Sequence, residues 1–412
     1  MKRIQPGYLA SPRKSLYFDT VKKQIILRKN EEHRLLSGHQ WIFSNEIKSV
    51  LGKPEAGDIV ELLRHDEKFL GIGLYHPHSL IAFRLLSRER EEVGFAFFEE
   101  RIRRALELRT RIYGETGAFR LVNGESDFLP GLIIDKYNEM LALQTLSFGM
   151  DRRQTLIADV LESLFHPKSI VERNESSLRT LEQLPARKAV LRGTPDQTII
   201  EEHGVKMKVD LLTGQKTGAF LDQRENHQSI RKYAREREIL DVFCNEGGFS
   251  LHAGVAGART VEGVDASEHA VARAEVNASL NHLQNVSFRA MDAFEALKTY
   301  HASDKQFDVV ILDPPSFSRN KRTVATALKG YAELHRLAFR VVRPGGFLAT
   351  ASCSHHVTEE GFFAVVETSA RKEGRRVQLL ETSGAAPDHP VLPAMPETRY
   401  LKFGIFAVEQ SN

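Results

Sequence analysis

The sequence predicts an α/β protein with an open, Rossmann-like sheet in its C-terminal half, preceded by a small β-barrel and a small α/β unit. Apolar runs of strand type recur at βα spacing from residue 239 onward, and four of them carry an aspartate at or near their carboxyl end. The barrel is predicted by short strands separated by turn residues within the first 90 positions. These patterns divide the chain into residues 1–95, which include a basic N-terminal arm, 96–198 and 199–412.

Length and composition exclude several classes of protein. The 412 residues are enough for more than one domain. The two cysteines exclude a disulfide framework and suit a reducing cytoplasm. The first twenty residues lack the apolar core of a signal peptide, and no apolar run is long enough to span a membrane. We therefore expect a cytoplasmic protein without a membrane partner.

The N-terminal part is more basic than the remainder. Residues 1–90 hold 16 Lys and Arg against 10 Asp and Glu, a balance of +6, whereas the whole chain has +3. A basic domain joined to an enzyme core suggests a polyanionic partner such as RNA. A solvated basic face explains the same balance, and composition by itself favours that simpler explanation.

The barrel is expected to contain strands at 24–27, 58–63, 69–75 and 80–86, a helix around 30–37, and Trp41 in its core. The middle unit is expected to begin with an amphipathic helix over 97–113, whose arginines, Arg109 among them, lie on a solvated face. A hairpin (131–137 with 140–145), a helix (152–164) and a strand (169–172) complete it. A second hairpin, over 199–209, leads into the C-terminal unit.

The loop after the first core strand (239–243) indicates the kind of cofactor. Asn245 and Glu246 precede a glycine pair, in which Gly247 permits a positive φ and the close approach of a ligand. The spacing is not the G-x-G-x-x-G that seats a pyrophosphate, and polar and acidic groups stand where phosphates would need room. A cofactor without phosphates and with a positive centre fits better, which favours S-adenosylmethionine.

Four of the five predicted core strands (239–243, 261–265, 286–292, 307–313 and 347–351) supply aspartates: Asp241, Asp265, Asp292 and Asp313. We expect all four aspartates to contact the cofactor, with Asp265 holding the ribose hydroxyls and Asp292 accepting from the adenine amino group. Helix capping explains any one of these aspartates, but it does not easily explain four in register. The pattern predicts a class I methyltransferase core.

Residues 213–226, just ahead of the first core strand, are dense in polar groups. A loop-to-helix junction capped by Asp222 explains part of this density. We expect the remainder to form part of the cofactor pocket, with Phe220 covering a ring of the cofactor and Arg224 meeting its methionine carboxylate bidentately.

The chain carries several stretches that occur together in one protein family: EEHGVKMKVDLLTGQKTGAFLDQREN, DVFCNEGGFS, DVVILDPPSF, SCS, PDHPV and LVNGESDFLPGLIIDKY. In this combination the chain resembles the bacterial ribosomal RNA large subunit methyltransferase I family, from about residue 22 to the end. The resemblance implies a PUA domain, a central EEHGxK domain and a Rossmann-like methyltransferase domain. It also implies methylation of cytosine C5 in 23S ribosomal RNA with S-adenosylmethionine. The sequence departs from the family at Asn245-Glu246, where an aromatic residue and threonine are usual.

Methylation of cytosine C5 requires a thiolate that adds to C6 and an acid that holds the N3/N4 edge of the base. Cys353 follows the fifth core strand and Asp313 ends the fourth, so both are expected in one crevice. A buried structural role also fits Cys353. Positive charge from Arg319, Lys321 or His355 is expected to lower the pKa of the thiol.

The loop after the fourth strand is expected to contact RNA. Pro314 and Phe317 would meet the base, and Arg319, Lys321 and Arg322 would meet phosphates, although a solvated loop explains these cations equally well. Related Asp-Pro-Pro loops serve enzymes that methylate an exocyclic amine without a cysteine, so this reaction stays open. A non-catalytic RNA-binding or assembly factor with the same fold also stays open. The expected partner is 23S ribosomal RNA or a ribosomal particle, a homodimer is not excluded, and no metal site is expected.

Overall fold

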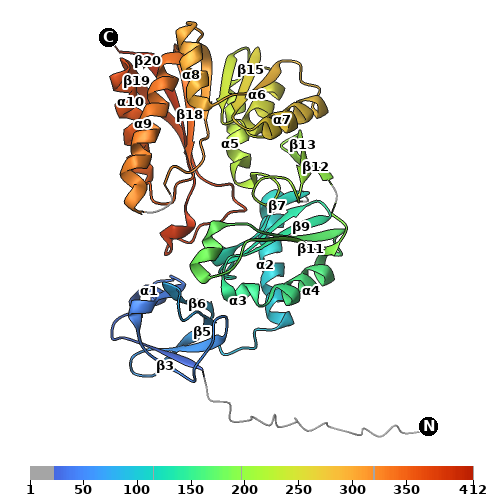
Figure 1. Ribbon diagram of the computed structural model, residues 1–412, viewed down its shortest axis with the longest axis vertical. Coiled ribbons are helices and arrows are strands. Elements are labelled where there is room, and N and C mark those ends of the chain that lie inside the picture. Colours follow the sequence, from blue (N-terminus) through green and yellow to red (C-terminus); the bar gives the residue numbers. More distant parts are fainter. Residues whose placement is uncertain (1–22, 115, 196, 319–320, 412) are drawn as a thin grey trace, which may run out of the picture.

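The computed structural model describes residues 23–114, 116–195, 197–318 and 321–411, which form three successive units (Figure 1). An N-terminal barrel is followed by a central α/β unit and then by a C-terminal sheet covered by helices on both faces. The predicted fold class is confirmed. The expected N-terminal arm lies outside the described residues.

The barrel is a six-stranded sheet in the order β2-β6-β5-β4-β1-β3, and it encloses a core that includes Ile25, Leu62 and Phe83. Its elements are β1 (Gln24–Leu27), α1 (His33–Leu36), β2 (Trp41–Phe43), β3 (Ile47–Leu51), β4 (Ile59–Leu63), β5 (Phe69–Tyr75) and β6 (Ile81–Ser87). The prediction missed β2 and β3. The first is only three residues long, and the second has no buried residue, so neither has a clear apolar alternation.

Trp41 lies at the contact between the barrel and the central unit, so the prediction of a core position is wrong. Its indole Nε1 donates to Glu125 Oε1 at 2.9 Å, and the Arg84 guanidinium lies 5.3 Å from its ring centroid. Arg84 also forms ion pairs with Glu125 and Glu182 of the central unit. Because the indole N–H of a tryptophan needs a hydrogen-bond acceptor, this polar contact suits Trp41 better than an apolar core does.

The central unit is a five-stranded sheet in the order β11-β10-β9-β8-β7, with α2 and α4 packed against each other. Its elements are α2 (Phe95–Tyr113), β7 (Ala118–Asn123), β8 (Leu132–Tyr137), β9 (Met140–Thr145), α3 (Phe148–Asp151), α4 (Gln154–Phe165), β10 (Ser169–Asn174) and β11 (Arg187–Gly193). The hairpin β8–β9 is confirmed, with antiparallel pairing from Leu132–Thr145 to Tyr137–Met140. The prediction missed the two edge strands, β7 and β11.

Arg109 is fully buried, which contradicts its predicted place on a solvated face of α2. Its guanidinium donates to both carboxylate oxygens of Asp127, at 2.5 and 2.7 Å, and to the Asp388 carbonyl at 2.7 Å. Asp388 also accepts from the backbone N–H of Arg120. Because Asp388 comes from the distant C-terminal segment, this buried network joins the central unit to the C-terminal unit.

The second predicted hairpin is present as β12 (Gln197–Glu202) and β13 (Val205–Asp210). The C-terminal unit follows, with seven strands in the order β16-β15-β14-β17-β18-β20-β19. Its strands are β14 (Glu238–Val242), β15 (Thr260–Asp265), β16 (Val286–Ala290), β17 (Phe307–Leu312), β18 (Val342–Ser352), β19 (Arg375–Ser383) and β20 (Lys402–Gln410). The first five are parallel to one another and were predicted. β20 pairs antiparallel with both β18 and β19, and neither β19 nor β20 was predicted.

Helices cover both faces of this sheet, because alternate strand residues point to opposite sides (Figure 1). One face, with Leu240, Val310 and Leu348, packs against α8, α9 and α10. The other face, with Ile239 and Ile311, packs against α6. The helices are α5 (Arg224–Ser229), α6 (Gly248–Val255), α7 (Glu268–Leu280), α8 (Ala293–Ala302), α9 (Val324–Val341) and α10 (Glu359–Lys372). Within the described part of the chain, no helix is both long and apolar enough to cross a membrane.

Candidate active site

A cavity of about 620 Å³ opens at the carboxyl ends of the parallel strands. The strand order places its lining residues in sequence across the sheet: Asp292 after β16, Asp265 after β15, Asn245 after β14, Asp313 after β17 and Cys353 after β18. This is the edge where open α/β sheets bind their ligands. Six carboxylates line the cavity, namely Glu202, Asp222, Glu246, Asp265, Asp292 and Asp313. The donor set fits a cofactor that carries positive charge.

The loop after β14 turns sharply under the cavity. Asn245 has a φ of 49° and Gly247 a φ of 90°, both in the left-handed region. The backbone N–H of Asn245 donates to Asp265 Oδ2 at 3.0 Å, and its side-chain amide donates to Gln215 Oε1 at 3.1 Å. Gly247 itself does not line the cavity. A Cβ at Gly247 would lie 3.0 Å from the Phe288 ring, so glycine serves both the turn and the packing here.

Asp265 and Asp292 both line the cavity, and both also support the backbone. Asp265 Oδ1 accepts from the N–H of Ser267 at 2.9 Å. Asp292 Oδ1 caps α8 by accepting from the N–H groups of Phe294 and Glu295, at 2.9 and 3.1 Å. Each of these two carboxylates therefore supports the backbone and also lines the cavity. Each still has lone pairs that can accept a hydrogen bond from a ligand.

Asp241 is fully buried and does not line the cavity. Its Oδ2 accepts from the N–H and the hydroxyl of Ser250, at 3.1 and 2.6 Å, which fixes the start of α6. Burial raises the pKa of Asp241 to about 7. Its contribution to a cofactor site is to position the loop, which differs from the direct contact predicted.

Asp313 and Cys353 line the same cavity at neighbouring strand ends. Asp313 Oδ2 accepts from Gln223 Nε2 at 2.9 Å, and the Gln223 amide is oriented by Asn226 at 2.6 Å. Burial, followed by the charge of Asp222, raises the pKa of Asp313 to about 6. A carboxyl group with that pKa exchanges a proton readily near neutral pH.

The predicted lowering of the Cys353 thiol pKa is wrong. Burial, followed by the charge of Asp313, raises the pKa of Cys353 to about 11. His355 does not counter this, because burial lowers its own pKa and leaves it neutral. Arg319 lies outside the described residues, and the structure does not describe the side chain of Lys321.

The loop after β17 places only part of the predicted RNA-binding set at the cavity. Pro314 lines it, whereas the Phe317 ring packs against Tyr331 with a centroid distance of 4.7 Å and does not line it. Lys321 begins a short 3-10 helix (Lys321–Thr323), and Arg322 is exposed there. Arg319 is not described.

Phe220 lines the cavity as predicted, with Lys216 Nζ lying 4.2 Å from its ring centroid, but Arg224 does not. The Arg224 side chain is buried against the central unit, where it donates to the Ala118 carbonyl and lies 4.7 Å from the Tyr113 ring centroid. The prediction that Arg224 meets the cofactor carboxylate is therefore not supported by its position. Its role is to join α5 to the central unit.

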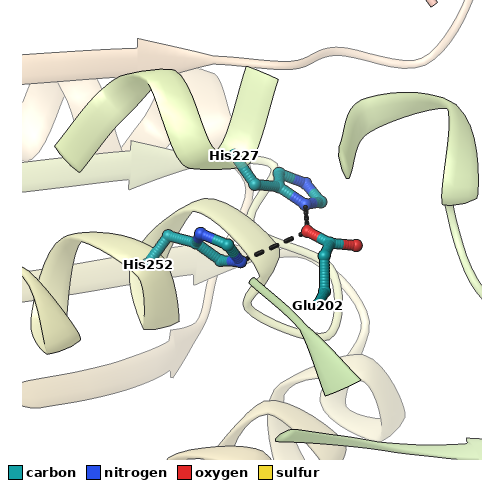
Figure 2. A group of neighbouring side chains, drawn as sticks. All are labelled: Glu202, His227 and His252. Carbon is teal, nitrogen blue, oxygen red and sulfur yellow. Dashed lines mark hydrogen bonds and ion pairs between the residues drawn. The ribbon is translucent and has the colours of Figure 1, made fainter. Parts of the chain in front are cut away.

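A buried cluster of Glu202, His227 and His252, shown in Figure 2, escaped the sequence analysis. Glu202 Oε1 lies 2.7 Å from His227 Nδ1 and 3.2 Å from His252 Nε2. Glu202 and His227 line the cavity and His252 lies behind them. The three residues come from β12, α5 and α6, so no short sequence motif contains all of them.

The cluster has the residue types of a metal site, but its hydrogen bonds oppose one. Arg231 Nε donates to His252 Nδ1 at 3.2 Å, so that nitrogen must be unprotonated. In a neutral imidazole the proton then sits on Nε2, facing Glu202. That nitrogen has no lone pair to offer a metal ion.

Comparison with known proteins identifies the kind of protein to which this cavity belongs. Residues 182–403 match the S-adenosylmethionine-dependent methyltransferase family model, and residues 25–88 match a PUA-like domain. The ribosomal RNA large subunit methyltransferase I of Tolumonas auensis is 39% identical over 92% of this chain and 97% of its own. The protein of the same name from Aeromonas salmonicida is 40% identical over 92% of this chain and 97% of its own. The chain belongs to the ribosomal RNA large subunit methyltransferase I family.

Family membership confirms the resemblance drawn from the sequence motifs, and the protein is an S-adenosylmethionine-dependent methyltransferase as predicted. A solved methyltransferase complexed with SAH has the same fold, with a TM-score of 0.81 and 22% identity over 93% of this chain and 99% of its own. A second, from Streptococcus mutans, gives a TM-score of 0.80 at 22% identity and the same coverage.

Proposed function

We propose that this family member forms 5-methylcytosine in 23S ribosomal RNA through a covalent adduct with Cys353. The observation that carries the proposal is that Cys353 and Asp313 line one cavity at adjacent strand ends. The curated relatives are named for ribosomal RNA of the large subunit, which supports the substrate. A base inside a helix must be flipped out to enter such a cavity.

The first step forms a bond between Cys353 Sγ and C6 of the cytosine. The C5=C6 electron pair shifts toward C4, and N3 takes a proton. Asp313 supplies that proton, because its raised pKa keeps part of it protonated near neutral pH. Gln223 occupies Oδ2, so Oδ1 of Asp313 remains to face the base.

Bound S-adenosylmethionine supplies the electrophilic methyl group that C5 of the adduct takes up. A base then removes the proton from C5, the C5=C6 bond re-forms, the bond to Cys353 breaks, and Asp313 regains the proton from N3. His355 is the proposed base, because it lines the cavity and burial keeps it neutral.

Lys402 is the proposed partner of the Cys353 thiolate. Its Nζ donates to the carbonyls of Ser354 and Tyr400, at 2.6 and 2.8 Å, and it forms no ion pair with a carboxylate among the described residues. Burial lowers the pKa of Lys402 to about 8, while the charge of a Cys353 thiolate raises it. Near neutral pH a lysine with this pKa is an ammonium, so loss of the Cys353 thiol proton to water creates an ammonium–thiolate pair in which each ion offsets the buried charge of the other.

Replacing Lys402 with methionine should raise the pH at which Cys353 becomes reactive. An opposite charge nearby typically lowers a thiol pKa by about one to three units, so its loss raises the alkylation midpoint by about one unit or more. The rate of iodoacetamide modification of Cys353 measures this in a Cys244→Ser background. Lys232→Met, at an exposed site paired with Glu381, is the control. An unchanged midpoint in Lys402→Met would show that the ammonium does not act on Cys353.

The product of the reaction tests the proposed function directly. Large-subunit RNA from an unmodified source, incubated with the enzyme and S-adenosylmethionine, should yield 5-methylcytidine on nucleoside mass spectrometry. The alternative enzyme, which uses the Asp313-Pro314 loop to methylate an exocyclic amine, gives an N-methylated nucleoside instead. Finding only the N-methylated product would reject the C5 reaction.

The barrel is the proposed RNA-binding unit. It matches a PUA-like domain, and Lys29, Lys48 and Lys53 are exposed on it. Lys29 follows β1, Lys48 lies in β3 and Lys53 follows β3, and these two strands pair with each other. Exposed lysines suit contacts with phosphates, which give affinity without reading sequence.

A further inference from the structure

A positively charged side chain is a strong partner for the methionyl carboxylate of the cofactor, and Arg224 does not line the cavity. We propose that His227, held by Glu202, binds the carboxylate of the methionyl group of S-adenosylmethionine. The argument rests on the orientation of the imidazole, the charges that face it and its place in the cavity (Figure 2).

The orientation of His227 leaves one ring nitrogen for a ligand. Its Nδ1 lies 2.7 Å from Glu202 Oε1, so Nδ1 carries a proton and donates it to the carboxylate. Its Nε2 has no hydrogen-bond partner among the described residues, and the residue lines the cavity. Nε2 is therefore the nitrogen available to a ligand.

Gly248 allows the imidazole to reach this position. A Cβ at Gly248 would lie 2.4 Å from His227 Cε1 and 2.5 Å from its Nε2, which any other residue would turn into a clash. The ring also meets Phe249 edge-on, with centroids 4.5 Å apart. His227 is thus packed against the first turn of α6, directly after the loop that carries Asn245.

The charges that face His227 favour its protonated form. Burial alone would lower its pKa, but Glu202 of β12, Asp313 after β17 and Asp241 of β14 together raise it. From α6 it faces His252, whose own pKa burial lowers to about 4, so His252 is neutral and adds no charge. An imidazolium with Nε2–H exposed to the cavity is a charge-assisted donor for a carboxylate.

Other cations of the cavity are less suited to this role. Lys216 Nζ is already bound to both carboxylate oxygens of Asp222, at 3.1 and 2.9 Å, and lies over Phe220. His355 is neutral because burial lowers its pKa. Arg231 contacts His252 and the His203 carbonyl and does not line the cavity.

The position of His227 also suits an extended cofactor. Asp292 and Asp265 lie at the ends of β16 and β15, on one side of the β14 loop, where adenine and ribose are expected. His227 packs against the residues that directly follow this loop and interacts with Asp313 after β17 on the other side. The reacting sulfur would then lie between the two ends, near Asp313 and Cys353.

Two adenosine ligands separate this proposal from a purely structural role. S-adenosylhomocysteine carries the carboxylate, and 5′-deoxy-5′-methylthioadenosine lacks the amino-acid part. Calorimetry of the full-length protein should show that His227→Gln lowers the affinity for S-adenosylhomocysteine by about tenfold or more. This is the contribution expected of one charge-assisted hydrogen bond. Binding of methylthioadenosine should stay within about twofold, and His227→Arg should restore the preference for S-adenosylhomocysteine.

His252→Gln is the matched control, because His252 approaches the same Glu202 oxygen and does not line the cavity. Its preference between the two ligands should equal that of the unsubstituted protein. If His227→Gln lost affinity for both ligands equally, or for neither, the proposal would be overturned. If His227→Gln does not fold, the ¹⁵N shift of His227 Nε2 in the unsubstituted protein decides. This chemical shift should change when S-adenosylhomocysteine is added and stay the same when methylthioadenosine is added. An equal change with both ligands would reject the proposal.

Discussion

Replacing Cys353 with serine is expected to abolish cytosine C5 methylation, with a loss of about 10⁴-fold or more, in the range found when a catalytic nucleophile is removed. C5 of cytosine is a poor nucleophile until a thiolate has added to C6, so no other side chain of the cavity replaces this function. Transfer of radioactive methyl to RNA measures the loss.

The covalent step gives a second readout on the same residue. RNA that carries 5-fluorocytosine at the target should become trapped on the enzyme, because fluorine cannot leave C5 as a proton does. The adduct should survive denaturing electrophoresis, require S-adenosylmethionine, and be absent from Cys353→Ser. An active Cys353→Ser enzyme would overturn the mechanism and favour methylation of an exocyclic amine.

Cys244 provides the matched control for this experiment. It lines the same cavity, but it is 5% exposed and burial raises the pKa of its thiol well above the usual value. Its Sγ would lie 3.1 Å from a Cβ at Gly263, which indicates tight packing. Cys244→Ser should form the adduct normally, and an adduct mapped to Cys244 would contradict the assignment of Cys353.

The central parallel strands of the C-terminal sheet, β14 and β17, could be predicted because each is a short apolar run buried on both faces. In both, the pattern and the ends agree with the structure within about one residue. β16 lies at one edge of the sheet and has no buried residue, so it was recognised by its place in the βα series. β19 could not be recognised in the same way, because its residues are mostly exposed at the edge of the sheet. β19 therefore lacks the apolar alternation on which such a prediction rests.

The positions of buried charged side chains were the least predictable part. Arg109 and Arg224 looked like surface or ligand-binding arginines, because their partners Asp388 and Ala118 lie 279 and 106 positions away. The same holds for Glu202 and His227, which are 25 positions apart and meet only when β12 packs against α5 and α6. Local sequence contains no information on such pairs. By contrast, Asp265, Asp292 and Asp313 reached one cavity because strand ends meet at one edge of a parallel sheet.

Replacing Asp265 with alanine should weaken cofactor binding by about a hundredfold or more, since a ribose diol forms two charge-assisted hydrogen bonds of about 1.5–3 kcal/mol each. The carboxylate also accepts from the N–H groups of Asn245 and Ser267, so alanine removes support of the loop as well. Asp265→Asn keeps the side-chain shape and one acceptor oxygen, so it retains part of the loop support that alanine removes.

The matched control is Asp308→Asn at the opposite end of β17. Both carboxylate oxygens of Asp308 likewise accept hydrogen bonds, from the N–H of Glu238 at 2.8 Å and from Arg343 Nη1 at 2.7 Å, but Asp308 does not line the cavity. Calorimetry with S-adenosylhomocysteine should show a large loss in Asp265→Asn and almost none in Asp308→Asn. Because each aspartate accepts two hydrogen bonds within the protein, a comparable loss in the two variants would mean that stability, and not a ribose contact, accounts for the effect. Unchanged affinity in a folded Asp265→Ala protein would remove Asp265 from the cofactor site altogether.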